Sequence, residues 1–166
     1  HVNAVASDQA EGVLAALSAA EATEPVSTTE QCVITFVSDI SEISSVSVSG
    51  DIAIVGNKSN NEDQGRAHIF EKQTDTYGVV GWVQVMMIQA SDAAPGDKFG
   101  VSVAITGDVA IVGAIGDDDG GTNSGSAYIF EKQTDTYGVV SWPQVAKLTA
   151  ELTADDAVAG DRFGWS

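Results

Sequence analysis

The chain has 166 residues, and its 24 acidic against seven basic side chains give a formal net charge of −17. A surface this acidic repels phosphate backbones and anionic lipid, so nucleic acids and membrane surfaces are poor partners. A single cysteine, Cys32, excludes an internal disulfide and a cysteine-based zinc site. No apolar run approaches the ~20 residues that a membrane-spanning helix needs, so we expect no direct membrane insertion.

The N-terminal segment differs in composition from the rest of the chain. The run EGVLAALSAAEA from Glu11 to Ala22 places its apolar residues near one helical face and predicts a short helix. Pro25 and a polar stretch then end the helical pattern, and a strand-like run begins near Cys32. We therefore expect a helical or linker segment over residues 1–28 and a β-rich domain over residues 29–166.

The β-rich part contains an internal repeat. The matching blocks are IFEKQTDTYGVV at 69–80 and 129–140, SGDIAIVG at 49–56 and TGDVAIVG at 106–113, and GDKFG at 96–100 and GDRFG at 160–164. The spacing between blocks varies only in loop-like stretches, as expected for repeated structural units. We expect a first unit over about 39–95, a second over about 96–159, and the start of a third at 160–166.

Each unit contains four strand-like segments that are rich in β-branched and aromatic residues. They lie at 101–105, 108–114, 126–131 and 142–148 in the second unit, and near 44–48, 51–57, 67–71 and 82–88 in the first. Gly50-Asp51 and Gly107-Asp108 predict tight hairpins between the first two strands. Four antiparallel strands in about 60 residues match one propeller blade. The expected fold is all-β, a β-propeller fragment of about two four-stranded antiparallel blades behind a short N-terminal helix.

Three short motifs carry a family resemblance. Phe99-Gly100 and Phe163-Gly164 supply an FG element, and Val112-Gly113-Ala114 supplies a GAP-like element. With these motifs the chain resembles the FG-GAP repeat, the propeller blade at the head of integrin α chains, and most closely the subgroup found in microbial secreted and surface proteins. The first unit departs from the pattern, because Glu42-Ile43 stands where FG is expected.

The resemblance implies recognition outside the cell, and it does not identify the ligand. The integrin type usually carries a calcium loop between its first two strands. In this chain the connection is the short Thr106-Gly107-Asp108, which is too short to wrap a cation that needs six to eight oxygen ligands. The family's usual metal site is therefore not carried over to this sequence.

Acidic residues gather in the connections that follow the second and fourth strands, which emerge at one end of an antiparallel unit. In the second unit this end carries Asp117, Asp118 and Asp119, and then Asp155, Asp156 and Asp161. Clustered carboxylates on glycine-containing loops suit a hard cation, so Asp117, Asp118 and Asp119 are candidates to coordinate calcium. Asp155, Asp156 and Asp161 are candidate ligand-binding residues. Consecutive aspartates do not follow the spaced EF-hand pattern, however, and solvated turns explain them as well. The sequence requires no cofactor, and calcium is the one ion that it suggests.

The duplicated EKQTDTYGVV places Tyr77 and Tyr137 in equivalent turns, where exposed tyrosines would make a repeated recognition hairpin. Recent duplication of one unit explains the identity without any selection for binding, and we regard it as the simpler interpretation. Ser102 lies in a repeat strand without the pattern of a nucleophile elbow, and the carboxylates form no distinctive acid and base pair.

These patterns favour a non-enzymatic binding or adhesion module of a larger extracellular or cell-surface protein, which recognises protein or carbohydrate through loops at the blade ends. The remaining blades would come from the full-length chain or from self-association. One alternative is a scaffold or substrate-docking propeller of a secreted enzyme whose catalytic part lies elsewhere. Another is a purely structural array of repeats.

Overall fold

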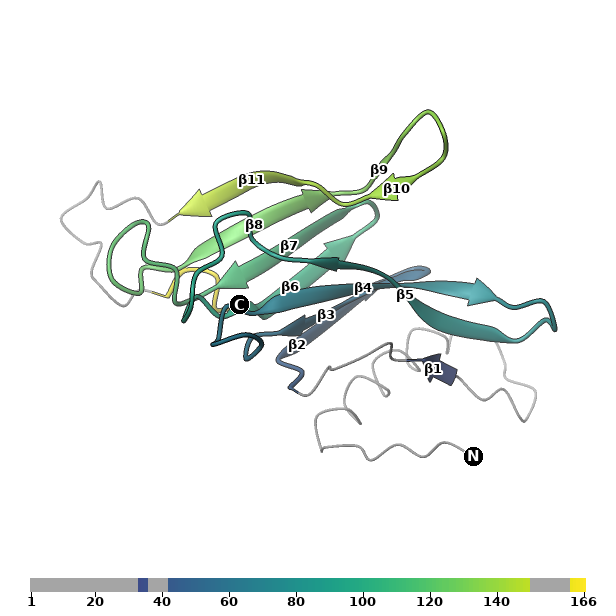
Figure 1. Cartoon of the computed structure of the whole chain (residues 1–166), viewed down its shortest axis with the longest axis horizontal. Helices are drawn as coiled ribbons and strands as arrows, with labels where there is room; N and C mark the ends of the chain where they lie inside the picture. Colours follow the sequence, from purple (N-terminus) through teal and green to yellow (C-terminus); the bar gives the residue numbers. More distant parts are fainter. Residues whose placement is uncertain (1–32, 36–41, 150–161) are drawn as a thin grey trace.

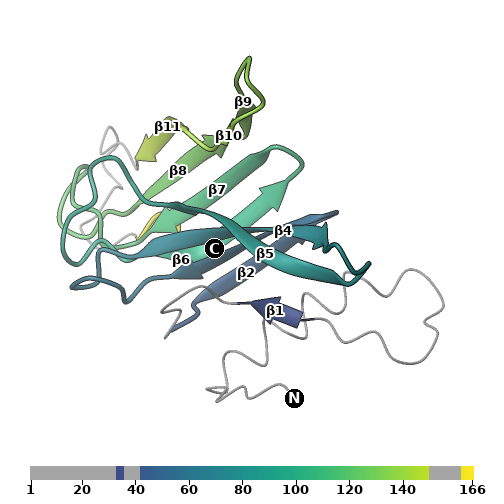
Figure 2. The same ribbon diagram turned by 45° about the vertical axis from the view of Figure 1, so that its right-hand side comes forward.

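The structure is a computed structural model that describes residues 33–35, 42–149 and 162–166. All regular structure in these residues is β, and the helix predicted for the N-terminal segment lies outside them. Two sheets stack with one face of each turned toward the other (Figure 1), and the turned view in Figure 2 shows the same layering. The all-β expectation is confirmed, and no membrane-spanning helix is found in the described part of the chain.

The first sheet has four antiparallel strands and one added edge strand. In spatial order they are β2 (Ser45–Ser49), β3 (Ile52–Asn57), β4 (Arg66–Thr74) and β5 (Val80–Ile88), with β1 (Val33–Thr35) parallel to β5 at the outer edge. Ser49 pairs with Ile52 across the two-residue turn that the sequence predicts at Gly50-Asp51. Gly50 has a φ of 59°, a backbone region that suits glycine.

The second sheet repeats the four antiparallel strands. Its order is β6 (Phe99–Thr106), β7 (Val109–Ala114), β8 (Ser126–Glu131) and β11 (Gln144–Thr149), and a small ribbon of β9 (Gln133–Thr134) and β10 (Val140–Ser141) extends from it. The four-stranded antiparallel units predicted from the repeat are therefore confirmed.

The main core lies between the two sheets. Alternate residues of the first sheet, among them Ile54 and Ile69, pack against Val112, Phe130 and Trp142 of the second, and all five side chains are buried. Burying an aliphatic or aromatic side chain of this size contributes about 1.5–3 kcal/mol each. Trp142, which stands just before β11, is thus a packing residue of this core.

The two sheets are related as successive repeats, so equivalent residues face in the same direction. Ile54 of β3 corresponds to Ile111 of β7, and each occupies the same row of its own sheet. Ile54 faces the second sheet and is buried, whereas Ile111 faces away from the first sheet and is 38% exposed. The second sheet thus presents to solvent the face that the first sheet buries.

Serine hydroxyls join the edge strands β2 and β6 of the two sheets. The hydroxyls of Ser45, Ser47 and Ser49 on β2 accept hydrogen bonds from the backbone N–H groups of Val103, Ile105 and Gly107, at 3.2, 3.1 and 3.1 Å. β6 is the edge strand of its sheet, so these N–H groups lack a neighbouring strand. The serines that alternate with valine in β2 therefore provide hydrogen-bond acceptors for the free backbone N–H groups at the edge of the second sheet.

The FG element forms the junction between the units. The buried Phe99 ring makes edge-to-face contacts with Tyr128 and Phe130, with ring centroids 5.5 and 5.9 Å apart. Gly100 has a φ of 87°, and its carbonyl oxygen would lie 2.0 Å from a Cβ on Gly56. Glycine is needed at both positions for the two backbones to approach this closely. Gly56 is the counterpart of Gly113 in the GAP-like element, so one contact explains the glycines of both motifs.

The outer edges of the two sheets differ at equivalent positions. Thr35 of β1 pairs with Val83 of β5, so the first sheet accepts a parallel strand at this point. The corresponding residue of the second sheet is Pro143, which lies just before β11 and has no N–H group to donate.

Candidate functional site

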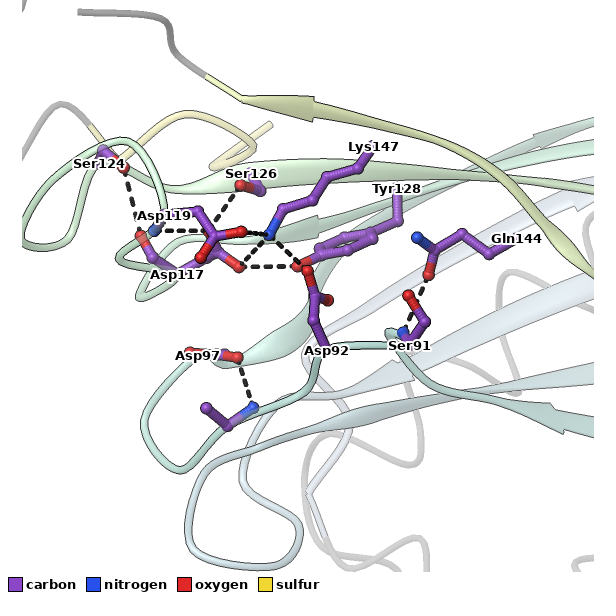
Figure 3. A network of polar contacts seen from close by, with 11 residues as sticks. Ser91, Asp92, Asp97, Asp117, Asp119, Ser124, Ser126, Tyr128, Gln144 and Lys147 are labelled. Carbon is purple, nitrogen blue, oxygen red and sulfur yellow. Dashed lines mark hydrogen bonds and ion pairs between the residues drawn. The ribbon is translucent and has the colours of Figure 1, made fainter.

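The acidic end of the molecule is organised around one lysine. The Lys147 ammonium, from β11, lies 2.7 Å from Asp92 Oδ2, 2.9 Å from Asp117 Oδ2 and 2.5 Å from Asp119 Oδ2 (Figure 3). It also lies 5.1 Å from the centre of the Tyr128 ring. We call these five residues the Lys147 clamp. Asp92 follows the last strand of the first sheet and the other members belong to the second, so the clamp ties the two units together.

Asp117 is the most enclosed carboxylate of the clamp, with 4% of its surface exposed. Its Oδ2 accepts from the Tyr128 hydroxyl at 2.7 Å, and its Oδ1 accepts from the Ser126 hydroxyl at 2.8 Å and the Asp119 N–H at 3.2 Å. Burial raises the pKa of Asp117, but the hydrogen bonds from Lys147, Tyr128 and Ser126 outweigh burial and hold that pKa below its ordinary value. Asp117 is therefore ionised and its oxygens are already engaged.

The other charged partners respond to the same surroundings. Burial lowers the pKa of Lys147, but its contacts with Asp119, Asp92 and Asp117 outweigh this and raise the pKa well above its ordinary value. Burial raises the pKa of Tyr128, and its hydrogen bond to the Asp117 carboxylate raises it further. Lys147 thus stays charged and Tyr128 stays a neutral hydrogen-bond donor at neutral pH.

The clamp holds the ligand types that a hard cation prefers. One carboxylate oxygen each from Asp92, Asp117 and Asp119 lies within 4.8 Å of the others. The Lys147 ammonium occupies the point where these oxygens converge and bonds to all three residues. In this arrangement the lysine supplies the positive charge, and the group acts as an ion-paired cross-link between the sheets.

The predicted acidic residues separate in the structure. Asp117 and Asp119 join the clamp, whereas Asp118 Oδ1 accepts from the Asn123 N–H at 2.6 Å and closes its own loop. Asp155, Asp156 and Asp161 lie outside the described residues. The counterpart of Asp161 at the start of the second unit is Asp97, whose carboxylate accepts from the Ala94 N–H at 2.7 Å and so closes a turn.

Sequence reasoning missed Asp92 and Lys147. Lys147 pairs with Tyr128 across β11 and β8, so both side chains lie on the face turned toward the first sheet. A lysine at an inward position of an otherwise apolar face was the available signal. A second contact missed by sequence reasoning joins the units nearby, where the Ser91 N–H donates to Gln144 Oε1 at 3.0 Å (Figure 3).

The duplicated segments form two identical hairpin tips, which we call the arms (residues 74–80 and 134–140). Tyr77 and Tyr137 lie at the tips, and each is 91% exposed. In the first arm, Asp75 Oδ1 accepts from the N–H groups of Tyr77 and Val79, both at 2.8 Å. Asp135 makes the same two bonds at the same distances in the second arm. The aspartates therefore fix both turns in one conformation.

The arms lie at the end of the sheets opposite the clamp. In Figure 1 the β4–β5 and β9–β10 hairpins both extend away from the loops that carry the acidic residues. A cavity of about 290 Å³ lies at the base of the first arm, lined by residues 73–75 and 79–83. The molecule thus has one end closed by internal ion pairs and another that exposes two equivalent tyrosines.

Comparison with known proteins identifies one family. The FG-GAP repeat family matches residues 82–130, from Trp82 in β5 to Phe130 in β8. The matched stretch therefore runs across the junction at Phe99-Gly100 and includes the buried core strands β6 and β7. No curated protein matches the chain. Residues 82–130 of the chain are thus an FG-GAP repeat, as the FG and GAP-like motifs predict.

Proposed function

We propose that this chain is a non-enzymatic binding module of a larger extracellular or cell-surface protein, and that it recognises a protein or carbohydrate partner through its two arms. The observation that carries the proposal is the pair of identical hairpin tips, each of which exposes 91% of a tyrosine on a turn held by an aspartate.

The chemistry of the arms suits recognition. A tyrosine offers a large apolar ring and a hydroxyl, and it loses little conformational freedom on binding, which is why it is enriched at interfaces. The bonds from Tyr77 N–H and Val79 N–H to Asp75 fix the turn before a partner arrives, so less ordering opposes binding. The arms are identical, although the units already differ nearby, at Val83 and Pro143.

The two sheets share one arrangement of strands. We propose that they are neighbouring blades of a β-propeller, since each has four antiparallel strands and an FG junction to the next unit. The acidic end was the first candidate for recognition, but the oxygens of Asp117 are engaged by Ser126, Tyr128 and Lys147. The arms therefore take precedence over the clamp as the binding surface.

The test compares the chain with the double variant Tyr77→Ser/Tyr137→Ser on two probe sets, a glycan array and an array of extracellular protein ectodomains. Val145→Ser, at an exposed residue of β11 outside the arms, is the matched control. We expect reproducible binding by the parent chain and by the control, and at least a tenfold loss for the double variant with unchanged circular dichroism. Binding that survives the loss of both tyrosines would refute the proposal. Selective binding to the polymeric substrate of a hydrolase would favour the alternative of an enzyme's docking domain.

A further inference from the structure

We infer that the turns beside the FG junction form an anion pocket, a site for a small ligand that carries a phosphate or sulfate ester. The pocket is a cavity of about 240 Å³. Its lining includes three basic residues, Lys58, Lys98 and Arg162, and three apolar ones, Val101, Ile115 and Trp165. The cavity shares no lining residue with the one at the base of the first arm, so the inference does not depend on what the arms bind.

The two repeats build the pocket from equivalent turns. Lys58 follows β3 and Ile115 follows β7, and the two hold the same place in their units. Lys98 and Arg162 likewise hold the same place in GDKFG and GDRFG. The second strand of each unit ends where the first strand begins, so these turns lie at the end of the sheets that also carries Asp117.

The pocket gathers positive charge in an acidic chain. Its three basic residues are three of the seven in the whole sequence. Within the described ranges none of the three pairs with a carboxylate, whereas Lys132 and Lys147 both do. Asp97 and Asp117, which flank the pocket in the chain, are buried and accept hydrogen bonds elsewhere. The charge of the pocket is therefore available to an anionic ligand.

Backbone conformation indicates a use for two of these side chains. Lys98 and Arg162 have φ values of 59° and 53°, in the left-handed region that glycine and asparagine occupy most easily. The turn itself therefore gives no reason for a long basic side chain. A basic side chain nevertheless stands at this place in both copies of the motif, as lysine in one and as arginine in the other. The charge is kept while the residue changes, as a contact with an anion requires.

The walls of the pocket select the chemistry of the ligand. The Arg162 guanidinium lies 5.7 Å from the centre of the Trp165 ring, a contact that orients the guanidinium plane and leaves its N–H edge for oxygen atoms. A fork of donors beside lysine ammonium groups matches the several oxygens of a phosphate or sulfate. The net charge of −17 repels a polyanion, so one ester group on a small, partly apolar body fits best.

Nuclear magnetic resonance of the isotope-labelled full chain tests the inference. The chain has three tryptophans, of which Trp165 lines the anion pocket, whereas Trp82 and Trp142 are buried in the sheets. The indole N–H peaks of the two buried residues are internal controls and report that each variant is folded, and Trp165→Phe assigns the pocket peak. The probes are phenyl phosphate and phenyl sulfate, with phenol as the neutral control, all at one ionic strength.

Three variants measure the role of charge. Lys98→Asn and Arg162→Asn each remove one positive charge from the pocket and place a residue that tolerates the turn. Lys72→Gln removes one positive charge from β4, outside the pocket, and is the matched control.

We expect both esters to shift the Trp165 peak along a saturating curve and to leave the Trp82 and Trp142 peaks in place. Each asparagine variant should raise the Kd by about tenfold or more, because one charge-assisted contact is lost, and Lys72→Gln should leave the Kd unchanged. The ester that binds more tightly identifies the group, phosphate or sulfate, that the pocket takes. The inference is overturned if neither ester gives a saturating shift, if phenol shifts the peak as strongly, or if binding survives in both asparagine variants.

Discussion

The Tyr128 hydroxyl donates a 2.7 Å hydrogen bond to Asp117 Oδ2, and through it the second sheet holds a nearly buried carboxylate against Lys147. Three side-chain donors depend on this carboxylate, from Tyr128, Ser126 and Lys147. Its removal leaves the two hydroxyls buried without their acceptor, which is costlier than losing an exposed contact.

Asp117→Ala is expected to lower the free energy of unfolding by about 3 kcal/mol, because it breaks a buried ion pair and its hydrogen bonds together. The neighbouring Asp118→Ala removes one exposed loop contact and should cost about 0.5–1 kcal/mol. Urea unfolding monitored by tryptophan fluorescence measures both. Equal losses for the two variants would show that the clamp contributes no more than the loop.

Lys147→Met should convert the clamp into a calcium-dependent site, because the three carboxylates lose the ammonium that neutralises them. A ligand that binds only the folded state at ten times its Kd adds about 1.4 kcal/mol of stability. We expect calcium to raise the Tm of the variant and to leave the Tm of the parent chain unchanged, with a chelator as the control. A calcium-dependent rise in the parent would mean that the lysine is displaced by the ion.

His68 should make the chain less stable as the solution is acidified. Burial lowers its pKa, and the nearby Arg66 lowers it further, so the folded state holds the imidazole neutral. The neutral imidazole contributes its full stability above the pKa of His68 in the unfolded state, about 6.5. That stability is lost as the pH falls from there toward the lower pKa of the folded state, by up to about 1.4 kcal/mol per pH unit. His68→Phe should flatten urea midpoints between pH 7 and pH 5. Parallel pH profiles for parent and variant would contradict this assignment.

Gly56→Ala tests the close approach at the FG junction. A Cβ at this position would lie 2.0 Å from the Gly100 carbonyl oxygen, so two backbones must separate, and we expect a loss of about 3 kcal/mol. Gly50→Ala is the matched control, because Gly50 has a positive φ and no atom within 4 Å of a Cβ. It should cost only about 1 kcal/mol of backbone strain. Thermal unfolding of both variants separates the clash from the strain.

The repeat made most of the fold predictable. Strand positions, the turns at Gly50-Asp51 and Gly107-Asp108, and the four-stranded units follow from alternation and from turn chemistry, which are local properties. The strand predicted to begin near Cys32 is present as β1, but its parallel pairing with β5 was not predicted, because edge pairing depends on which backbone groups remain free in three dimensions.

The candidate site was harder to predict. Sequence placed Asp117 and Asp119 at one end of the unit, which is where they lie, but it grouped them with Asp118. The contacts of Lys147 with Asp92 and Asp117 span 55 and 30 residues of sequence, and only the stacking of two sheets brings them together. Spacing within a loop carries no information about such a partner.

Val83 and Pro143 show two ways of controlling a sheet edge at one repeat position. An exposed edge strand is a template for unwanted pairing between molecules, and natural sheets protect such edges by covering them or by removing donors. In the first sheet the edge at Val83 is covered by a strand of the same chain, and in the second the donor is removed by Pro143. Duplicated units with the same unprotected sequence at both edges would be prone to add to one another in fibres, and the divergence at this position protects each edge in its own way.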